Sequence, residues 1–272
     1  MVRMEYKIIS GRTIETRQCW MPARSSAPFK KKRAPRVCGH TSLKKIGANE
    51  RDAIRRLARI INCNFGCGDL WITLKYSDDR LPASYEEAKK EITKFLRKIR
   101  TAYRADTGKN LRYIITTSQE NPRTGEKARL HHHIVMDRIA YEFLCRHWPQ
   151  DEISYTIMDN RGDHTAMARY MIQNAPKEAG KKKWSTSQGL KKPIYTEPEA
   201  IASIGKIEPL VGAEIKENML IQDADSGIET AYMRCVVDIP PEVRGNTVIF
   251  PKKRRRKGLS DPTNVRVHTR KQ

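Results

Sequence analysis

The order of strand and helix patterns between residues 70 and 174 constrains the fold of this chain more than any other feature. Short runs rich in β-branched and aromatic residues alternate with longer segments in which apolar residues recur at helical spacing. The longest helical segment opens with Ser84, followed three residues later by Glu87, which is the capping-box pattern of a helix start. The patterns predict strands at 70–76, 111–118, 129–136 and 153–158, and helices at 84–103, 140–148 and 164–174.

The first six of these elements follow the βαββαβ order of a ferredoxin-like fold, an antiparallel sheet with its helices packed on one face. We therefore predict an α+β protein whose main domain spans residues 68–193 and whose second sheet face is open. Two appendages flank this domain. Residues 1–67 predict a hairpin, a basic arm and a basic amphipathic helix, and residues 194–272 predict a small β appendage and a basic tail.

The charge balance favours a polyanionic partner. The chain carries 53 Lys and Arg against 31 Asp and Glu, a formal net charge of +22. A nucleic acid is the first expectation, and an anionic membrane surface or a merely basic soluble protein are the alternatives. No apolar run reaches the roughly 20 residues that span a bilayer, and the N-terminus lacks a signal-peptide core, so we expect a cytoplasmic protein with no membrane partner.

Six cysteines in 272 residues do not form the dense pattern of a disulfide framework. Cys63 and Cys67 have a spacing that suits two ligands of a zinc ion, and Cys38 and His40 are candidates to complete such a site. No second closely spaced cysteine pair exists, so free cysteines are the favoured interpretation.

Three consecutive histidines lie inside the predicted strand 129–136. Side chains alternate between the faces of a strand, so His131 and His133 share one face, about 7 Å apart at Cα, and His132 lies on the other. Two imidazoles so placed suit one divalent ion. The preceding strand ends at Glu120, and a turn at 121–125 joins the two strands as a hairpin, so Glu120 is the predicted third ligand and Gln119 its competitor. Nitrogen and carboxylate ligands without a thiolate favour Mg²⁺ or Mn²⁺.

The helix at 164–174 contains Tyr170. A tyrosine in a helix is most often a core or rim residue, and its phenol is a poor nucleophile at neutral pH. Beside a divalent ion and a bound phosphodiester, however, a phenol becomes a credible attacking group. The catalytic interpretation of Tyr170 therefore depends on its distance from the histidines.

Three segments resemble the motifs of rolling-circle replication initiators of the HUH endonuclease superfamily, which are named for two histidines separated by one bulky residue. Residues 72–76 resemble the first motif, residues 130–136 the second and residues 168–173 the third, in the order typical of the family. Two positions depart from the pattern. Gln173 stands where many members have a lysine, and His132 is polar where the family prefers a large apolar residue.

The resemblance implies a single-stranded DNA nickase. Tyr170 would be the nucleophile and would form a 5′-phosphotyrosine, while the free 3′-hydroxyl would prime a host DNA polymerase, with a host helicase acting indirectly. The substrate would be single-stranded or hairpin origin DNA of a plasmid, phage or mobile element. The residues expected to contact this DNA are Arg169, Lys177, Gln173, Lys75 and Trp71.

Two other classes remain open. A transposase or a conjugative relaxase would share the site and differ in its DNA target. A non-catalytic, basic nucleic-acid-binding protein would use the ferredoxin-like sheet as a platform, and it predicts aromatic side chains on the sheet face where His131 and His133 are expected.

Overall fold

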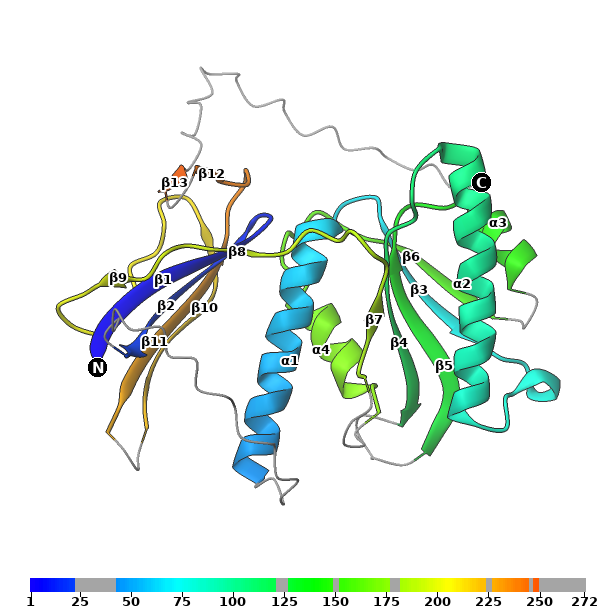
Figure 1. Ribbon diagram of the computed structural model, residues 1–272, viewed down its shortest axis with the longest axis horizontal. Coiled ribbons are helices and arrows are strands. Elements are labelled where there is room, and N and C mark those ends of the chain that lie inside the picture. The colour runs from blue at the N-terminus through cyan, green and yellow to red at the C-terminus, as the bar shows by residue number, and fades with distance from the viewer. Residues whose placement is uncertain are drawn as a thin grey trace, which may run out of the picture.

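The structure is a computed structural model, and it describes residues 1–22, 43–120, 127–148, 152–176, 182–223, 227–244 and 247–249. Within these residues the chain forms two antiparallel sheets of more than two strands, with helices between them and on the outer side of one of them (Figure 1). The predicted α+β class with antiparallel strands is confirmed. None of the described helices is long and apolar enough to cross a membrane.

The five-stranded sheet has the order β6-β3-β5-β4-β7, and each described pair in it is antiparallel. Its two central strands, β3 and β5, pair from Leu70 with Met136 to Lys75 with His131. The strands are β3 (Leu70–Lys75), β4 (Tyr113–Glu120), β5 (Lys127–Met136), β6 (Ile153–Ile157) and β7 (Ser185–Thr186).

Helices α2 (Tyr85–Thr107) and α3 (Tyr141–His147) cover one face of this sheet. The buried stripe of α2 packs on apolar side chains of β3, β4 and β5. The predicted capping box is confirmed, because the Ser84 hydroxyl accepts a hydrogen bond from the Glu87 N–H and the Glu87 carboxylate accepts one from the Ala83 N–H. A short 3₁₀ helix, Asp78–Arg80, precedes α2.

Helices α1 (Leu43–Asn64) and α4 (Thr165–Gln173) cover part of the opposite face. The prediction that helices pack on one face only, leaving the other open, was therefore wrong. The reason lies in the strands: Ile114 and Val135 alternate onto the second face, and their apolar side chains are buried against α1 and α4. Toward the other end of β5 this face is polar and remains accessible.

The six-stranded sheet combines the two ends of the sequence. Strands β1 and β2 form the predicted opening hairpin, β11 pairs with β2, and β8 and β9 pair with β1. The strands are β1 (Val2–Ser10), β2 (Thr13–Met21), β8 (Ile194–Tyr195), β9 (Glu199–Ala200), β10 (Glu214–Gln222) and β11 (Glu229–Val236), and a separate hairpin consists of β12 (Glu242–Arg244) and β13 (Thr247–Ile249).

Helix α1 lies between the two sheets and contacts both (Figure 1). Its Arg59 donates two hydrogen bonds of 2.6 Å to the buried carboxylate of Glu15 in β2. Its Asn62 donates to the Thr13 hydroxyl and accepts from the backbone N–H of His164, the residue before α4. The hairpin turn approaches so closely that a Cβ on Gly11, whose φ is +60°, would lie 2.3 Å from the Asn62 carbonyl oxygen. The six-stranded sheet thus fixes α1, and α1 fixes the start of α4.

Candidate active site

Strand β5 places its three histidines as the alternation predicts. His132 points into the core under α2 and is fully buried. Its Nε2 lies 2.7 Å from the Tyr76 hydroxyl and its Nδ1 lies 2.9 Å from the Thr117 hydroxyl. Burial lowers the pKa of His132 to about 3, so this imidazole is neutral and serves the core.

His131 and His133 point to the opposite face, toward each other. Their Nε2 atoms are 3.0 Å apart, and the rings meet edge to face with centroids 4.7 Å apart. The other ring nitrogen of each residue is also engaged. Nδ1 of His131 donates to the Arg129 carbonyl oxygen at 2.7 Å, and Nδ1 of His133 lies 3.1 Å from the Thr73 hydroxyl.

This geometry suits two ligands of one cation. Because Nδ1 of His131 must carry a proton to donate to a carbonyl, its Nε2 presents a lone pair toward His133 when the ring is neutral. Burial lowers the pKa of both residues, to about 3 for His133, which keeps the rings neutral. With metal–nitrogen bonds of about 2.1 Å, two nitrogens at a right angle on one ion lie about 3 Å apart.

The predicted third ligand lies at the margin of what the structure describes. The backbone of Glu120 ends β4 and pairs with Lys127, after an irregularity between Ser118 and Glu120. Its side chain and the turn at 121–125 lie outside the described residues. Within the described ranges, no group of three or more His, Cys, Asp or Glu side chains is arranged to hold a metal. The role of Glu120 stays a prediction.

The alternative zinc site is only partly visible. Cys63 is half-buried at the end of α1 and Cys67 is exposed, and both are free thiols. Cys38 and His40, the residues that would complete the site, lie outside the described residues. Burial raises the pKa of the Cys63 thiol, which disfavours the thiolate form that binds metal.

Tyr170 lies beside the histidine pair. Helix α4 buries Ala168, Met171 and Ile172 against α1 and the sheet, and this turns Tyr170 outward, with 46% of its surface exposed. Its ring meets the ring of His133 edge to face, with centroids 4.9 Å apart. The structure therefore brings the sequence-predicted nucleophile and the sequence-predicted metal ligands together.

Trp71 supports this arrangement from behind. Its ring stacks on His133 with centroids 5.3 Å apart and planes 7° from parallel, and it contacts the edge of Tyr170 at 6.1 Å. Trp71 is half-buried, so in this structure one side of its ring is occupied by protein. Its predicted contact with DNA stays a prediction.

A cavity of about 510 Å³ opens in front of these groups. His131, His133 and Tyr170 line it, together with polar and charged side chains from the neighbouring strands. Lys75 reaches the cavity but pairs with Glu152 at 2.6 Å, and Arg129 pairs with Asp78. The two cations at the mouth of the cavity are thus already matched with carboxylates.

The remaining predicted DNA contacts lie on or after α4. Arg169 and Gln173 are exposed, and Gln173 is three residues from Tyr170, so the side chains of Tyr170 and Gln173 project from the same side of the helix. Lys177 lies outside the described residues.

Two residues at the site escape the motif patterns. Thr73 faces His133 because it pairs with it across β3 and β5, and the alternation of β3 is the signal that points to it. Asn174 is buried at the end of α4, where its amide donates to the Tyr170 carbonyl at 2.7 Å and its oxygen lies 3.5 Å from the Ser118 hydroxyl. An asparagine that directly follows a helix is a common cap, which hides its link to β4.

Comparison with known proteins supports the motif assignment. Residues 69–179 match a family model described as Replication-associated protein, of the ORF2 type. The match runs from the residue before β3 to beyond α4, and so includes the histidine strand and the tyrosine helix. Searches of curated proteins and of solved structures found no significant match. Through its residues 69–179, the chain belongs to this family of replication-associated proteins.

Proposed function

We propose that this replication-associated protein is an HUH-type endonuclease that nicks and rejoins single-stranded DNA to start rolling-circle replication. The observation that carries the proposal is the position of the Tyr170 ring, 4.9 Å from the ring of His133 at a shared, solvent-open cavity. The family match to residues 69–179 agrees with a role in replication. The strand order β6-β3-β5-β4, with helices after β3 and β5, supports a ferredoxin-like arrangement of this domain.

The proposed reaction uses the phenol oxygen of Tyr170. This oxygen attacks the scissile phosphorus in line, the phenol proton passes to solvent, and the bond between phosphorus and the 3′ oxygen breaks. The 3′ oxygen takes up a proton and leaves as a hydroxyl that can prime a host polymerase. The 5′-phosphotyrosine keeps a phosphodiester bond, so attack by a 3′-hydroxyl rejoins the strand without a nucleotide cofactor.

The donor set fits a divalent cation. His131 and His133 present convergent Nε2 atoms held by Arg129 and Thr73, and Glu120 is the proposed third ligand. Such an ion, Mg²⁺ or Mn²⁺, would polarise the scissile phosphate and offset the charge that develops on it. Trp71 and the burial of His133 hold the imidazoles in place before DNA binds.

The proposal is tested by covalent capture. The wild-type protein is incubated with end-labelled single-stranded origin DNA of its replicon, with Mn²⁺ or with EDTA, and the products are separated on a denaturing protein gel. We expect a metal-dependent labelled band that Tyr170→Phe reduces by at least about a thousandfold. Tyr141→Phe is the matched control, because Tyr141 is 44% exposed on the far face of the sheet and should leave the band unchanged.

The other outcomes separate the competing classes. A band that survives in Tyr170→Phe would move the nucleophile to another tyrosine, with Tyr195 and Tyr155 tested next. Tight binding of single strands without any covalent band would overturn the nickase and favour the non-catalytic binding protein. Adducts formed on transposon ends or a transfer origin, rather than a replication origin, would reassign the protein to a transposase or relaxase.

A further inference from the structure

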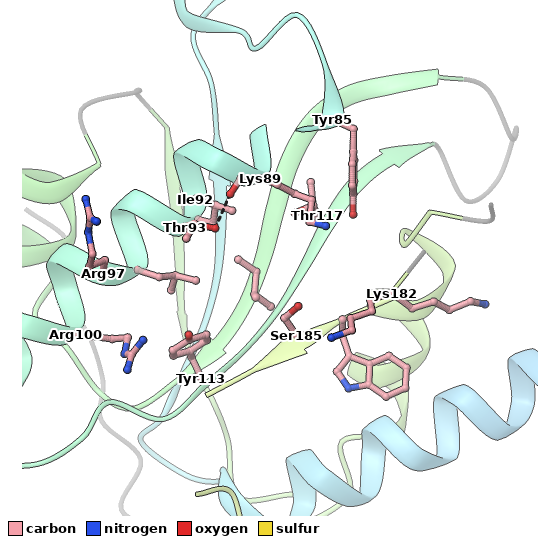
Figure 2. A pocket seen from close by; sticks show the side chains of 14 residues that line it. Tyr85, Lys89, Ile92, Thr93, Arg97, Arg100, Tyr113, Thr117, Lys182 and Ser185 are labelled. Carbon is pink, nitrogen blue, oxygen red and sulfur yellow. Dashed lines mark hydrogen bonds between the residues drawn. The ribbon is translucent and has the colours of Figure 1, made fainter. Parts of the chain in front are cut away.

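A second concave surface lies on the other side of the five-stranded sheet from Tyr170. It is a groove of about 310 Å³ between α2 and the edge of the sheet formed by β4 and β7. Figure 2 shows it with α2 on one side, Ser185 of β7 on the other, Tyr85 near one end and Tyr113 near Arg100 at the other. The groove therefore runs along β4.

The lining combines an apolar floor with aromatic walls. Ile92, Leu96 and Ile115 form the floor, and they belong to the core under α2 or to its edge. Tyr113 and Trp184 contribute rings, and Trp184 is half-buried at the sheet edge. Flat apolar surfaces of this kind accept the faces of nucleic-acid bases, whatever their sequence.

The rim is strongly basic. Arg97 and Arg100 come from α2, where they stand on the side that faces the sheet edge, and Lys182 and Lys183 come from the segment before β7. Within the described part of the chain no carboxylate lines the groove, and none of these four cations forms an ion pair. This contrasts with Lys75 and Arg129 at the Tyr170 cavity, which are both paired.

We propose that this groove binds a single-stranded segment of the DNA that is cut at Tyr170, with phosphates against Arg97 and Arg100 and bases against the aromatic walls. The inference rests on the proposed function, because it assigns a second contact surface for the same substrate. A groove that pairs unmatched cations with exposed ring faces has the chemistry of a single-strand site, whereas a duplex would leave the rings without bases to contact.

The sheet itself connects the two sites. Thr117 lines the Tyr85 end of the groove and pairs across the sheet with His132, the neighbour of both proposed metal ligands. Lys183 is held at the sheet edge, where its carbonyl accepts a hydrogen bond of 3.2 Å from Thr116. The histidines on β5 are two strand spacings from β7, about 10 Å, so a strand that rounds this edge passes from one site to the other within a few nucleotides.

The test compares two pairs of cations on α2 that carry the same charge. The groove variant is Arg97→Gln with Arg100→Gln, and the control is Lys90→Gln with Lys98→Gln, whose exposed side chains do not line the groove. Both are made in the Tyr170→Phe protein, so binding is measured without cleavage. The probe is a fluorescent thymidine oligomer of about 20 nucleotides, longer than a single short site, and anisotropy is followed across a salt series.

We expect the groove variant to bind the oligomer about tenfold or more weakly at moderate salt and to lose about 1.4 from the slope of log affinity against log salt, about 0.7 for each phosphate contact removed. The control should keep the slope of the Tyr170→Phe protein. Equal affinity and slope in the two variants would overturn the proposal. So would a groove-dependent affinity that a duplex of the same length competes for equally well, because the groove would then read duplex backbone.

The two hypotheses fail separately. Loss of the covalent band in every protein would overturn the nickase, while the anisotropy result would still show whether the groove holds a single strand. An intact covalent band together with identical salt slopes in the two variants would overturn the groove alone.

Discussion

The two faces of β5 show how one residue type acquires two roles. On the face under α2, both nitrogens of His132 contact hydroxyl groups, from Tyr76 and Thr117, and the ring is closed off from solvent. On the opposite face, His131 and His133 direct one nitrogen each toward protein and the other toward a shared point at the cavity. The difference lies in where the second nitrogen finds a partner.

This difference teaches that satisfied polar groups build a core and convergent unsatisfied ones build a site. A neutral imidazole whose donor and acceptor are both matched costs little to bury. Two imidazole lone pairs directed at each other repel unless a proton or a cation lies between them. The polar face of the sheet therefore gains stability when a cation binds, and the core face gains none.

The comparison is tested most strongly by removing one histidine from each face. His131→Ala should weaken Mn²⁺ binding by more than about 100-fold, beyond the loss typical of a supporting residue, and should change the free energy of unfolding little. His132→Ala should leave Mn²⁺ affinity unchanged and lower the free energy of unfolding by about 2–4 kcal/mol, because it opens a cavity and leaves two buried hydroxyls unmatched. Isothermal titration and urea denaturation give the two readouts.

Similar losses of Mn²⁺ affinity in both variants would show that the faces are not independent. In that case the fold around β5, rather than the Nε2 atoms, would control the affinity for the ion. A stability loss confined to His131→Ala would reverse the assignment of the faces.

A smaller effect is expected one residue further out, from two threonines on neighbouring strands. Thr73 contacts Nδ1 of His133 and Thr117 contacts Nδ1 of His132. Thr73→Val should weaken Mn²⁺ binding by about tenfold, since the hydroxyl orients a ligand. Thr117→Val, the same change on the other face, should lower the free energy of unfolding by about 1–2 kcal/mol and spare the ion. Equal Mn²⁺ affinities in the two variants would contradict an orienting role for Thr73.

Local patterns predicted much of the five-stranded sheet, because its order depends on short-range rules. The alternation of β5, the capping box at Ser84 and the helical spacing around Tyr170 each act within a few residues. These rules also predicted that His131 and His133 share a face. The position of Tyr170 next to them followed from the motif order, and the structure brings the three residues together.

What local rules could not supply is the pairing of distant segments. β11 joins β2 across more than 200 residues, and the Arg59–Glu15 pair connects α1 to that sheet. Such contacts depend on complementary faces rather than on spacing. The same limit explains the helices on the second face: Ile114 and Val135 had to be seen as a patch before α1 and α4 could be placed on it. The basic groove likewise needs α2 and residues 182–185 to meet.

The smallest predicted effect concerns the end of α4. The amide of Asn174 holds the Tyr170 carbonyl, and its oxygen approaches Ser118 of β4, so Asn174 positions the helix turn that carries the nucleophile. Asn64 plays the matching part at the end of α1, donating to the carbonyls of Ile60 and Lys191. Asn174→Ala and Asn64→Ala should each lower the free energy of unfolding by about 1–2 kcal/mol. Only Asn174→Ala should also slow covalent capture at saturating DNA, by about three- to tenfold, because a loosened α4 holds Tyr170 in line for a smaller fraction of the time. Equal capture rates at equal stability loss would reduce Asn174 to an ordinary helix cap.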